Sequence, residues 1–140
     1  MKVAVVYWSG TGNTEAMAEA IAAAVRKNGA KADLLTPDKF NAEAVAAYEA
    51  FAFGCPSMGD EVLEESEFQP MYDAVEGALA GKTVALFGSY GWGDGEWMRN
   101  WEKQAKENDL NVVSALIANE APDDDALAEL AAVGAKLATA

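Results

Sequence analysis

The sequence predicts a three-layer α-β-α sandwich built on one open parallel β-sheet. Short apolar runs, typical of strands buried on both faces, alternate five times with segments of helical spacing. The connections between them are short, which favours parallel strands with crossover helices on both faces of the sheet. The chain of 140 residues is long enough for one core, so we expect a single domain over residues 1–140.

Each repeat begins with a strand pattern. We expect strands at residues 3–7, 31–35, 50–53, 83–87 and 112–117. The first helical stripe begins at Thr14 and stops at Asn28-Gly29, a good C-terminal cap. Pro70 suits the first turn of a later helix, and residues 123–125 suit the start of the last one because acids are favourable there. The remaining helices are expected near residues 42–47 and 97–105.

The composition excludes several classes of function. Lys and Arg number 10 against 23 Asp and Glu, and the net charge of −13 repels nucleic-acid backbones and anionic lipid surfaces. The sequence has no His, which excludes histidine-dependent triads and His-ligated zinc or haem. The single cysteine, Cys55, excludes an internal disulfide and clusters held by four thiolates. We therefore expect no nucleic-acid, membrane or metal partner.

The N-terminal segment also bears on location. Its apolar run turns polar at Ser9, which makes it too short for a signal peptide. No stretch approaches the ~20 apolar residues of a membrane-spanning helix. We expect the protein in the reducing cytoplasm.

The loop from Ser9 to Thr14 follows the first expected strand and opens the first expected helix. It supplies hydroxyls, an amide and unhindered backbone N–H groups where the helix dipole favours an anion. No Lys lies between Lys2 and Lys27, which disfavours a triphosphate site, and Glu15 replaces the third glycine of the dinucleotide fingerprint. A terminal monophosphate held by neutral donors fits better. The alternative is an ordinary turn that caps a helix.

Two further loops follow the third and fourth expected strands and converge on the same sheet edge. Trp92 lies between glycines on a flexible loop, where it is available for stacking, while Trp97 and Trp101 have the helical spacing of core residues. Met58 could face the other side of a planar ligand, or it could fill a gap in the core. Cys55 is expected to be a small buried residue.

The acidic run at residues 60–67 contains no base. Most of its carboxylates are expected to form a solvated face. Glu61 is closest to the turn, and its carboxylate could accept a hydrogen bond from a ring N–H. A planar ring that bears an N–H group and carries a monophosphate tail is a description of FMN.

Taken together, three segments carry a resemblance that covers essentially the whole chain. They are residues 7–15 (YWSGTGNTE), 58–61 (MGDE) and 88–95 (GSYGWGDG). With these segments the chain resembles the flavodoxins, of the short-chain type found in anaerobic bacteria. The resemblance implies a five-stranded flavodoxin-like sheet in the order 2-1-3-4-5 and one tightly held, non-covalent FMN.

The resemblance also implies roles for particular residues. The loop at residues 9–14 would hold the phosphate, and Ser89 would lie near the ribityl end. Met58 and Trp92 would sandwich the isoalloxazine ring. Glu61 would accept the hydrogen of flavin N3.

Other implied contacts come from backbone groups and from the loop after the last strand. Gly59 would offer its carbonyl to flavin N5, and the amides of Gly91 and Gly93 would lie near O2. Either Asn119 or Glu120 would reach the ribityl chain, and Asn119 is our candidate. The expected FMN-binding residues are Ser9, Gly10, Thr11, Gly12, Asn13, Thr14, Pro56, Ser57, Met58, Gly59, Asp60, Glu61, Ser89, Tyr90, Gly91, Trp92, Gly93 and Asn119.

The function implied is that of a low-potential one-electron carrier, not an enzyme, with FMN cycling chiefly between neutral semiquinone and anionic hydroquinone. A phosphate loop without Lys or Arg and an acidic rim leave an added negative charge on the ring uncompensated, which lowers that potential. The partners implied are oxidoreductases that otherwise use ferredoxin, which would dock through basic surfaces onto residues 60–67. A small acidic carrier of this kind is expected to be a monomer.

Two other functions are considered. An FMN-dependent reductase acting on a small organic substrate would need an open pocket over the flavin, whereas Met58 and Trp92 are expected to cover both faces. A receiver-like signalling domain would need an acidic pair just after the first strand, where this chain has residues 8–10 (WSG).

Overall fold

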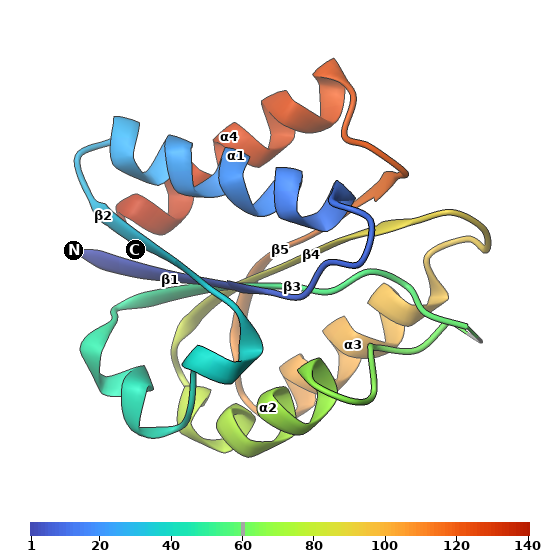
Figure 1. The fold of residues 1–140 in the computed structure, drawn as a ribbon. Helices are drawn as coiled ribbons and strands as arrows, with labels where there is room; N and C mark the ends of the chain where they lie inside the picture. Colours follow the sequence, from blue (N-terminus) through green and yellow to red (C-terminus); the bar gives the residue numbers. More distant parts are fainter. Residues whose placement is uncertain (60) are drawn as a thin grey trace.

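The computed structural model describes residues 1–59 and 61–140 (Figure 1). The strands are β1 (Lys2–Tyr7), β2 (Lys31–Leu35), β3 (Ala50–Gly54), β4 (Thr83–Tyr90) and β5 (Asn111–Asn119). The α-helices are α1 (Asn13–Lys27), α2 (Phe68–Val75), α3 (Glu96–Glu107) and α4 (Asp124–Ala138). Short 3-10 helices are η1 (Pro37–Lys39), η2 (Glu43–Ala47) and η3 (Glu76–Leu79).

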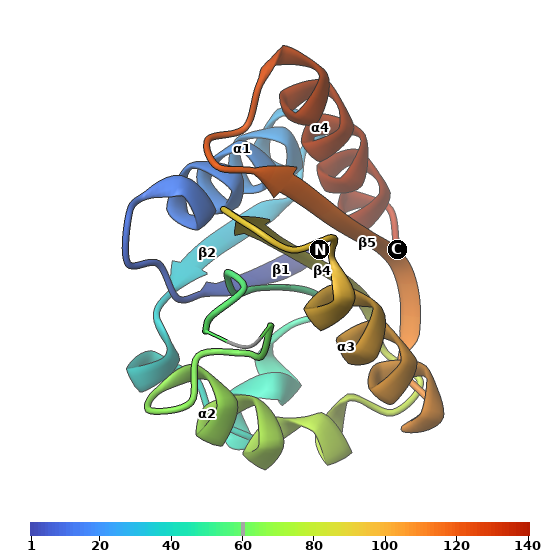
Figure 2. The same ribbon diagram turned by 90° about the vertical axis from the view of Figure 1, so that its right-hand side faces the viewer.

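The five strands form one parallel sheet in the order β2-β1-β3-β4-β5, which confirms the predicted fold. Helices α1 and α4 cover one face of the sheet, and α2 and α3 cover the other (Figures 1 and 2). The chain crosses from one side of β1 to the other between β2 and β3. Strand order therefore reverses at β1 and β3, whose C-terminal ends are the expected place for a ligand.

Two hydrophobic clusters lie on opposite faces of the sheet because alternate residues of a strand point to opposite sides. Val3 and Val5 belong to the cluster under α1 and α4, whereas Ala4 and Val6 belong to the cluster over α2 and α3. The second cluster is rich in aromatic rings. These include the buried Trp97 and Trp101 of α3, as their spacing predicts.

The observed elements differ from the predicted ones at several boundaries. The segment expected to be a helix near residues 42–47 forms only the 3-10 helix η2, which has five residues. The backbone of the next residue, Tyr48, is extended, so there is no room for a longer α-helix. The fourth strand continues past its predicted end at residue 87, because Ser89 and Tyr90 pair with residues of β5. Gly88 permits this continuation, since a Cβ there would lie 2.1 Å from the carbonyl oxygen of Cys55.

The last helix begins as predicted. Asp123 is its N-cap, and a side-chain oxygen of Asp123 accepts a hydrogen bond from the backbone N–H of Ala126 at 2.8 Å. Within the described part of the chain, the helices are all too short or too polar to cross a membrane.

Candidate functional site

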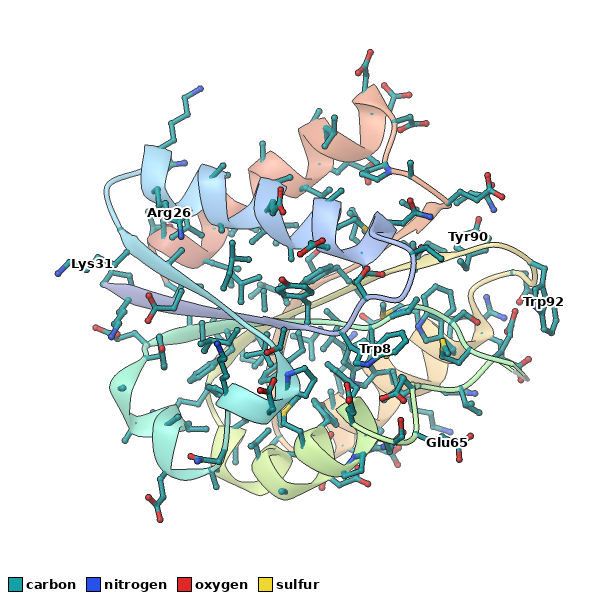
Figure 3. All side chains as sticks on the ribbon, viewed as in Figure 1. Trp8, Arg26, Lys31, Glu65, Tyr90 and Trp92 are labelled. Carbon is teal, nitrogen blue, oxygen red and sulfur yellow. The ribbon has the colours of Figure 1, made fainter. Side chains whose placement is uncertain are left out.

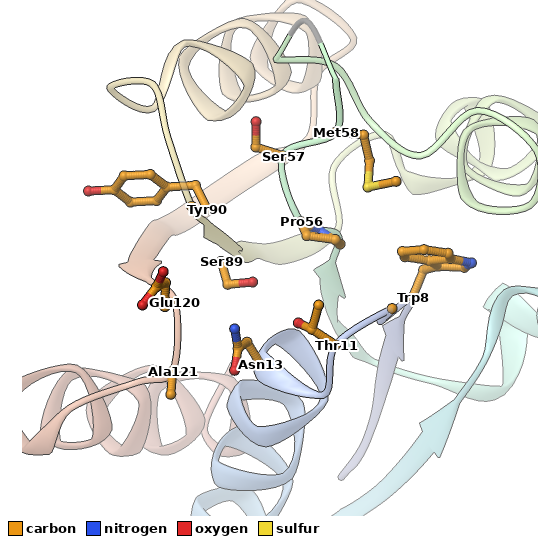
Figure 4. Close-up of a pocket in the computed structure, with 12 residues that line it drawn as sticks. Trp8, Thr11, Asn13, Pro56, Ser57, Met58, Ser89, Tyr90, Glu120 and Ala121 are labelled. Carbon is orange, nitrogen blue, oxygen red and sulfur yellow. The ribbon is translucent and has the colours of Figure 1, made fainter.

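A cavity of about 620 Å³ opens at the C-terminal ends of β1, β3 and β4 (Figure 4). Its walls come from the loops after these strands and from the segment after β5. The lining residues are Trp8, Gly10, Thr11, Asn13, Pro56, Ser57, Met58, Ser89, Tyr90, Gly91, Glu120 and Ala121. The structure thus brings together three loops that are far apart in the sequence, as the parallel sheet predicts.

The loop before α1 is shaped to leave backbone donors available. The hydroxyl of Ser9 accepts a hydrogen bond from the Gly12 N–H at 3.0 Å, which folds the loop back on itself. Gly12 is the N-cap of α1 and has a φ of 94°, a conformation that glycine adopts without strain. A glycine offers no side chain to cap the first turn, so the amides there remain free for an anion.

Ser89, at the end of β4, joins this loop to the sheet. Its hydroxyl oxygen lies 3.1 Å from that of Thr14, and its N–H donates to the Thr14 hydroxyl at 3.4 Å. Both side chains are buried. Ser89 also lines the cavity, while Thr14 supports it from behind.

A second hollow of about 490 Å³ is lined by Glu61, Trp92, Gly93, Asp94 and Glu96. Trp92 lies at the outer tip of its loop (Figure 3), with 65% of its surface exposed. The structure therefore places Met58 on the first cavity and Trp92 on the second. It does not bring the two side chains together over one space.

Glu61 is a buried acid on this second hollow, with a relative exposure of only 8%. One carboxylate oxygen, Oε1, accepts a hydrogen bond from the Asp94 N–H at 3.0 Å. The other, Oε2, is buried and has no hydrogen-bond partner among the described residues. Such an acceptor is costly unless a donor completes it. Gly93 gives Glu61 its space, since a Cβ there would lie 1.5 Å from Oε1.

Glu64 is an exception to the expectation that most acids at residues 60–67 form a solvated face. Its carboxylate is buried and accepts hydrogen bonds from the N–H groups of Ser66 (3.0 Å), Glu67 (2.7 Å) and Phe68 (2.8 Å), and from the Ser66 hydroxyl. Burial raises the pKa of Glu64, but these hydrogen bonds outweigh it and the net pKa is lowered. A run of acids in the sequence does not reveal that several backbone donors converge on one of them. Asp60 lies outside the described residues.

The comparison with known proteins decides the family. A family model described as flavodoxin matches residues 5–134. The chain belongs to the flavodoxin family. It is 46% identical over 122 residues to the flavodoxin of Megasphaera elsdenii, an alignment that spans 87% of this chain and 89% of that protein. It is also 46% identical over 121 residues to the flavodoxin of Clostridium beijerinckii, spanning 86% and 88%.

Solved structures agree with this assignment. The structure of two-electron reduced M. elsdenii flavodoxin superimposes with a TM-score of 0.92 at 43% identity and covers 99% of each chain. A flavodoxin from the domain Archaea superimposes with a TM-score of 0.85 at 28% identity. The close relatives are flavodoxins, which are electron-transfer proteins.

Some residues of this flavodoxin's cavity were not predicted from the sequence. Trp8 forms the wall beside Met58, and Ala121 lies on the opposite wall, next to the anticipated Glu120 (Figure 4). Of the two candidates after β5, Glu120 lines this cavity. Asn119 instead lines a smaller hollow against α4 and donates to the Tyr90 carbonyl at 3.4 Å. A signal for Trp8 was available, since an aromatic residue follows the strand directly and precedes the glycine loop.

The remaining predicted residues are placed as follows. Gly59 has a φ of 44° and directly follows Met58, which forms an antiparallel bridge with Val62. Cys55 is fully buried, and burial raises the pKa of its thiol to about 12, as suits an inert core residue. The Trp97 indole N–H donates to the Cys55 carbonyl at 3.2 Å, which fixes α3 beneath the cavity.

Proposed function

We propose that this flavodoxin is a one-electron carrier that holds a single FMN non-covalently. The observation that carries the proposal is the pairing of a neutral anion cradle at residues 9–14 with the partnerless, buried Oε2 of Glu61, both near the C-terminal edge of the sheet. The cradle at residues 9–14 can bind a phosphate monoester, and Oε2 of Glu61 can accept a hydrogen bond from a ring N–H. When bound, FMN supplies one-electron redox chemistry, and the protein tunes it.

The described residues divide the work of binding. The backbone of residues 9–14 would hold the phosphate, with the hydroxyl of Thr11 and the amide of Asn13 at hand on the cavity wall. Ser89 and Glu120 line the cavity beside the cradle, where they can accept hydrogen bonds from a polyol chain. Met58 and Trp8 lie at the other end, where an apolar ring would pack (Figure 4).

We further propose that the carrier works mainly between its one-electron-reduced and two-electron-reduced forms, at low potential. Among the described residues that line the two hollows there is no Lys or Arg, while Glu61, Glu96 and Glu120 are acids; the further acid Asp94 is paired with Arg99 at 3.0 Å. A further negative charge in this place is opposed by the carboxylates. The potential for adding the second electron is lowered accordingly.

We also propose that the partners are oxidoreductases with basic docking surfaces, of the kind that otherwise use ferredoxin, and that the protein meets them as a cytoplasmic monomer. Trp92 and Glu65 are exposed at the end of the molecule that carries the cavity, whereas Arg26 and Lys31 lie at the opposite end (Figure 3). This separation of charge would orient a basic partner toward the cavity.

The test is the absorption spectrum of the purified protein during stepwise reduction with dithionite, together with titration of apoprotein with FMN and FAD. We expect one flavin per chain, FMN in the extract, and separate one-electron and two-electron spectral changes. FAD in the extract, or apoprotein that ignores FMN, would overturn the assignment. Rapid turnover of a small organic substrate without a protein partner would favour a reductase instead.

A further inference from the structure

The indole of Trp8 is held from two sides. Its Nε1–H donates to Oε2 of Glu67 at 2.8 Å, across 59 residues of sequence. On the other side the ring packs against the backbone of Gly10, where a Cβ would lie 3.1 Å from its six-membered ring. The ring also packs on the aromatic core cluster above α2 and α3.

Glu67 is exposed, and an exposed glutamate ordinarily samples many rotamers. Here its backbone is fixed, because the Glu67 N–H donates to the buried Glu64 carboxylate, which also holds the N–H of Phe68 in the first turn of α2. Glu64 is anchored in turn by its own N–H, which donates to the Cys55 sulfur at 3.3 Å. Glu67 is the N-cap of α2, yet its side chain makes no capping bond. The Glu67 carboxylate is therefore available to accept the hydrogen bond from Trp8.

We propose that Glu67 is a positioning residue for the cofactor cavity. It fixes the plane of the Trp8 indole at the end of the cavity that Met58 shares, and it places a carboxylate charge at the N–H edge of that ring. The role in electron transfer rests on the proposed function, while the hold on the indole does not.

The first part of the experiment uses the indole N–H as the readout and needs no flavin. In ¹⁵N-labelled apoprotein, the Trp8 indole proton is assigned by its loss in Trp8→Phe and followed in three variants. Glu67→Gln keeps an acceptor oxygen and should keep the low-field signal of a hydrogen-bonded indole. Glu67→Ala should move the signal upfield and broaden it. Glu65→Gln, which removes the same charge from the exposed neighbouring acid, should leave it unchanged.

The second part separates charge from position in the FMN-loaded protein. Glu67→Gln should bind FMN within about twofold of the wild type and should raise the potential for the second electron, because a carboxylate charge is lost while the indole stays in place. Glu67→Ala should raise that potential and also weaken FMN binding more than Glu67→Gln does. Circular dichroism and thermal unfolding confirm that each variant folds.

The outcomes are distinguishable. A wild-type indole signal at the position of a free indole, or a signal that Glu67→Ala leaves in place, overturns the positioning role. Wild-type FMN affinity and potential in both Glu67→Gln and Glu67→Ala overturns the connection to the cavity. A wild-type apoprotein that fails to bind FMN overturns the proposed function, and the indole signals still decide whether Glu67 holds Trp8.

Discussion

Thr14 and Ser89 are 75 residues apart in the sequence, yet their hydroxyl oxygens lie 3.1 Å apart. The contact joins the first turn of α1 to the end of β4, so the anion cradle and the middle of the cavity share one hydrogen bond. Both hydroxyls are buried, so water cannot replace either of them as a hydrogen-bond partner unless the loop separates from the sheet.

Removing the Thr14 hydroxyl should therefore weaken both the fold and the FMN site. Thr14→Val keeps the shape but leaves the Ser89 hydroxyl and N–H without their partner, at a cost of about 1–3 kcal/mol in the free energy of unfolding. If about 1.4 kcal/mol of this loss appears as a weaker binding free energy for FMN at the cradle, the FMN affinity falls about tenfold. Denaturant unfolding and FMN titration measure the two effects.

A double-mutant cycle with Ser89→Ala provides the control. Because the two side chains contact each other, their effects should be less than additive by about 0.5–3 kcal/mol. Strict additivity would mean that the Thr14 and Ser89 hydroxyls act independently.

Gly93 is required by Glu61 and by its own backbone. Its φ is 88°, and a Cβ would lie 1.5 Å from Oε1 of Glu61. Gly93→Ala should destabilise the protein by about 1–3 kcal/mol through backbone strain and should displace the Glu61 carboxylate, which weakens FMN binding.

Gly77→Ala is the matched control, since a Cβ there meets nothing within 4 Å. It should be neutral or stabilise by about 0.4–1 kcal/mol. Similar effects of the two substitutions would contradict this assignment.

Glu64 makes stability depend on pH. Its folded pKa is lowered from the ordinary value of 4.5, so its contribution is present above that value and is lost as the pH falls through the lower, folded pKa. At pH 7, Glu64→Gln should cost about 1–3 kcal/mol of unfolding free energy, because charged hydrogen bonds are lost. The difference from wild type should shrink as the pH falls below 4.5. Urea unfolding at pH 7 and at about pH 3.5 tests this, and a difference that stays constant with pH would contradict it.

The sequence predicts the sheet and the loops that build the cavity because both depend on local signals. Apolar runs mark buried strands, and glycines and hydroxyls mark the loops. The parallel topology then brings the ends of β1, β3 and β4 to one edge without further information. Trp92 illustrates the limit of this reasoning. The sequence predicts that it is exposed on a flexible loop, but the position of that loop relative to Met58 depends on tertiary contacts.

The features missed by the sequence are contacts between distant segments. The continuation of β4 through Ser89 depends on pairing with β5, which overrides the glycine signal at Gly88. The hydrogen bond from Trp8 to Glu67 spans two segments that have no shared pattern. In the same way, a run of acids indicates solvation, and only the folded backbone reveals that Glu64 is enclosed by donors.

The structure also sharpens the test of electrostatic docking. Among the described acids of residues 60–67, Glu61 is buried and Glu64 and Glu67 carry internal hydrogen bonds, so Glu65 is the exposed acid whose replacement tests charge alone. Electron transfer to a small basic haem protein, followed by stopped flow, should slow as salt increases, because the screening length falls to about 8 Å at physiological ionic strength. At low salt Glu65→Gln should lower the association rate about twofold or more.

Glu43→Gln removes the same charge from η2, which leads into the start of β3 at the opposite end of the sheet, and it should have little effect. A rate that does not change with salt, or equal effects of the two variants, would show that the acids around the cavity do not guide the partner.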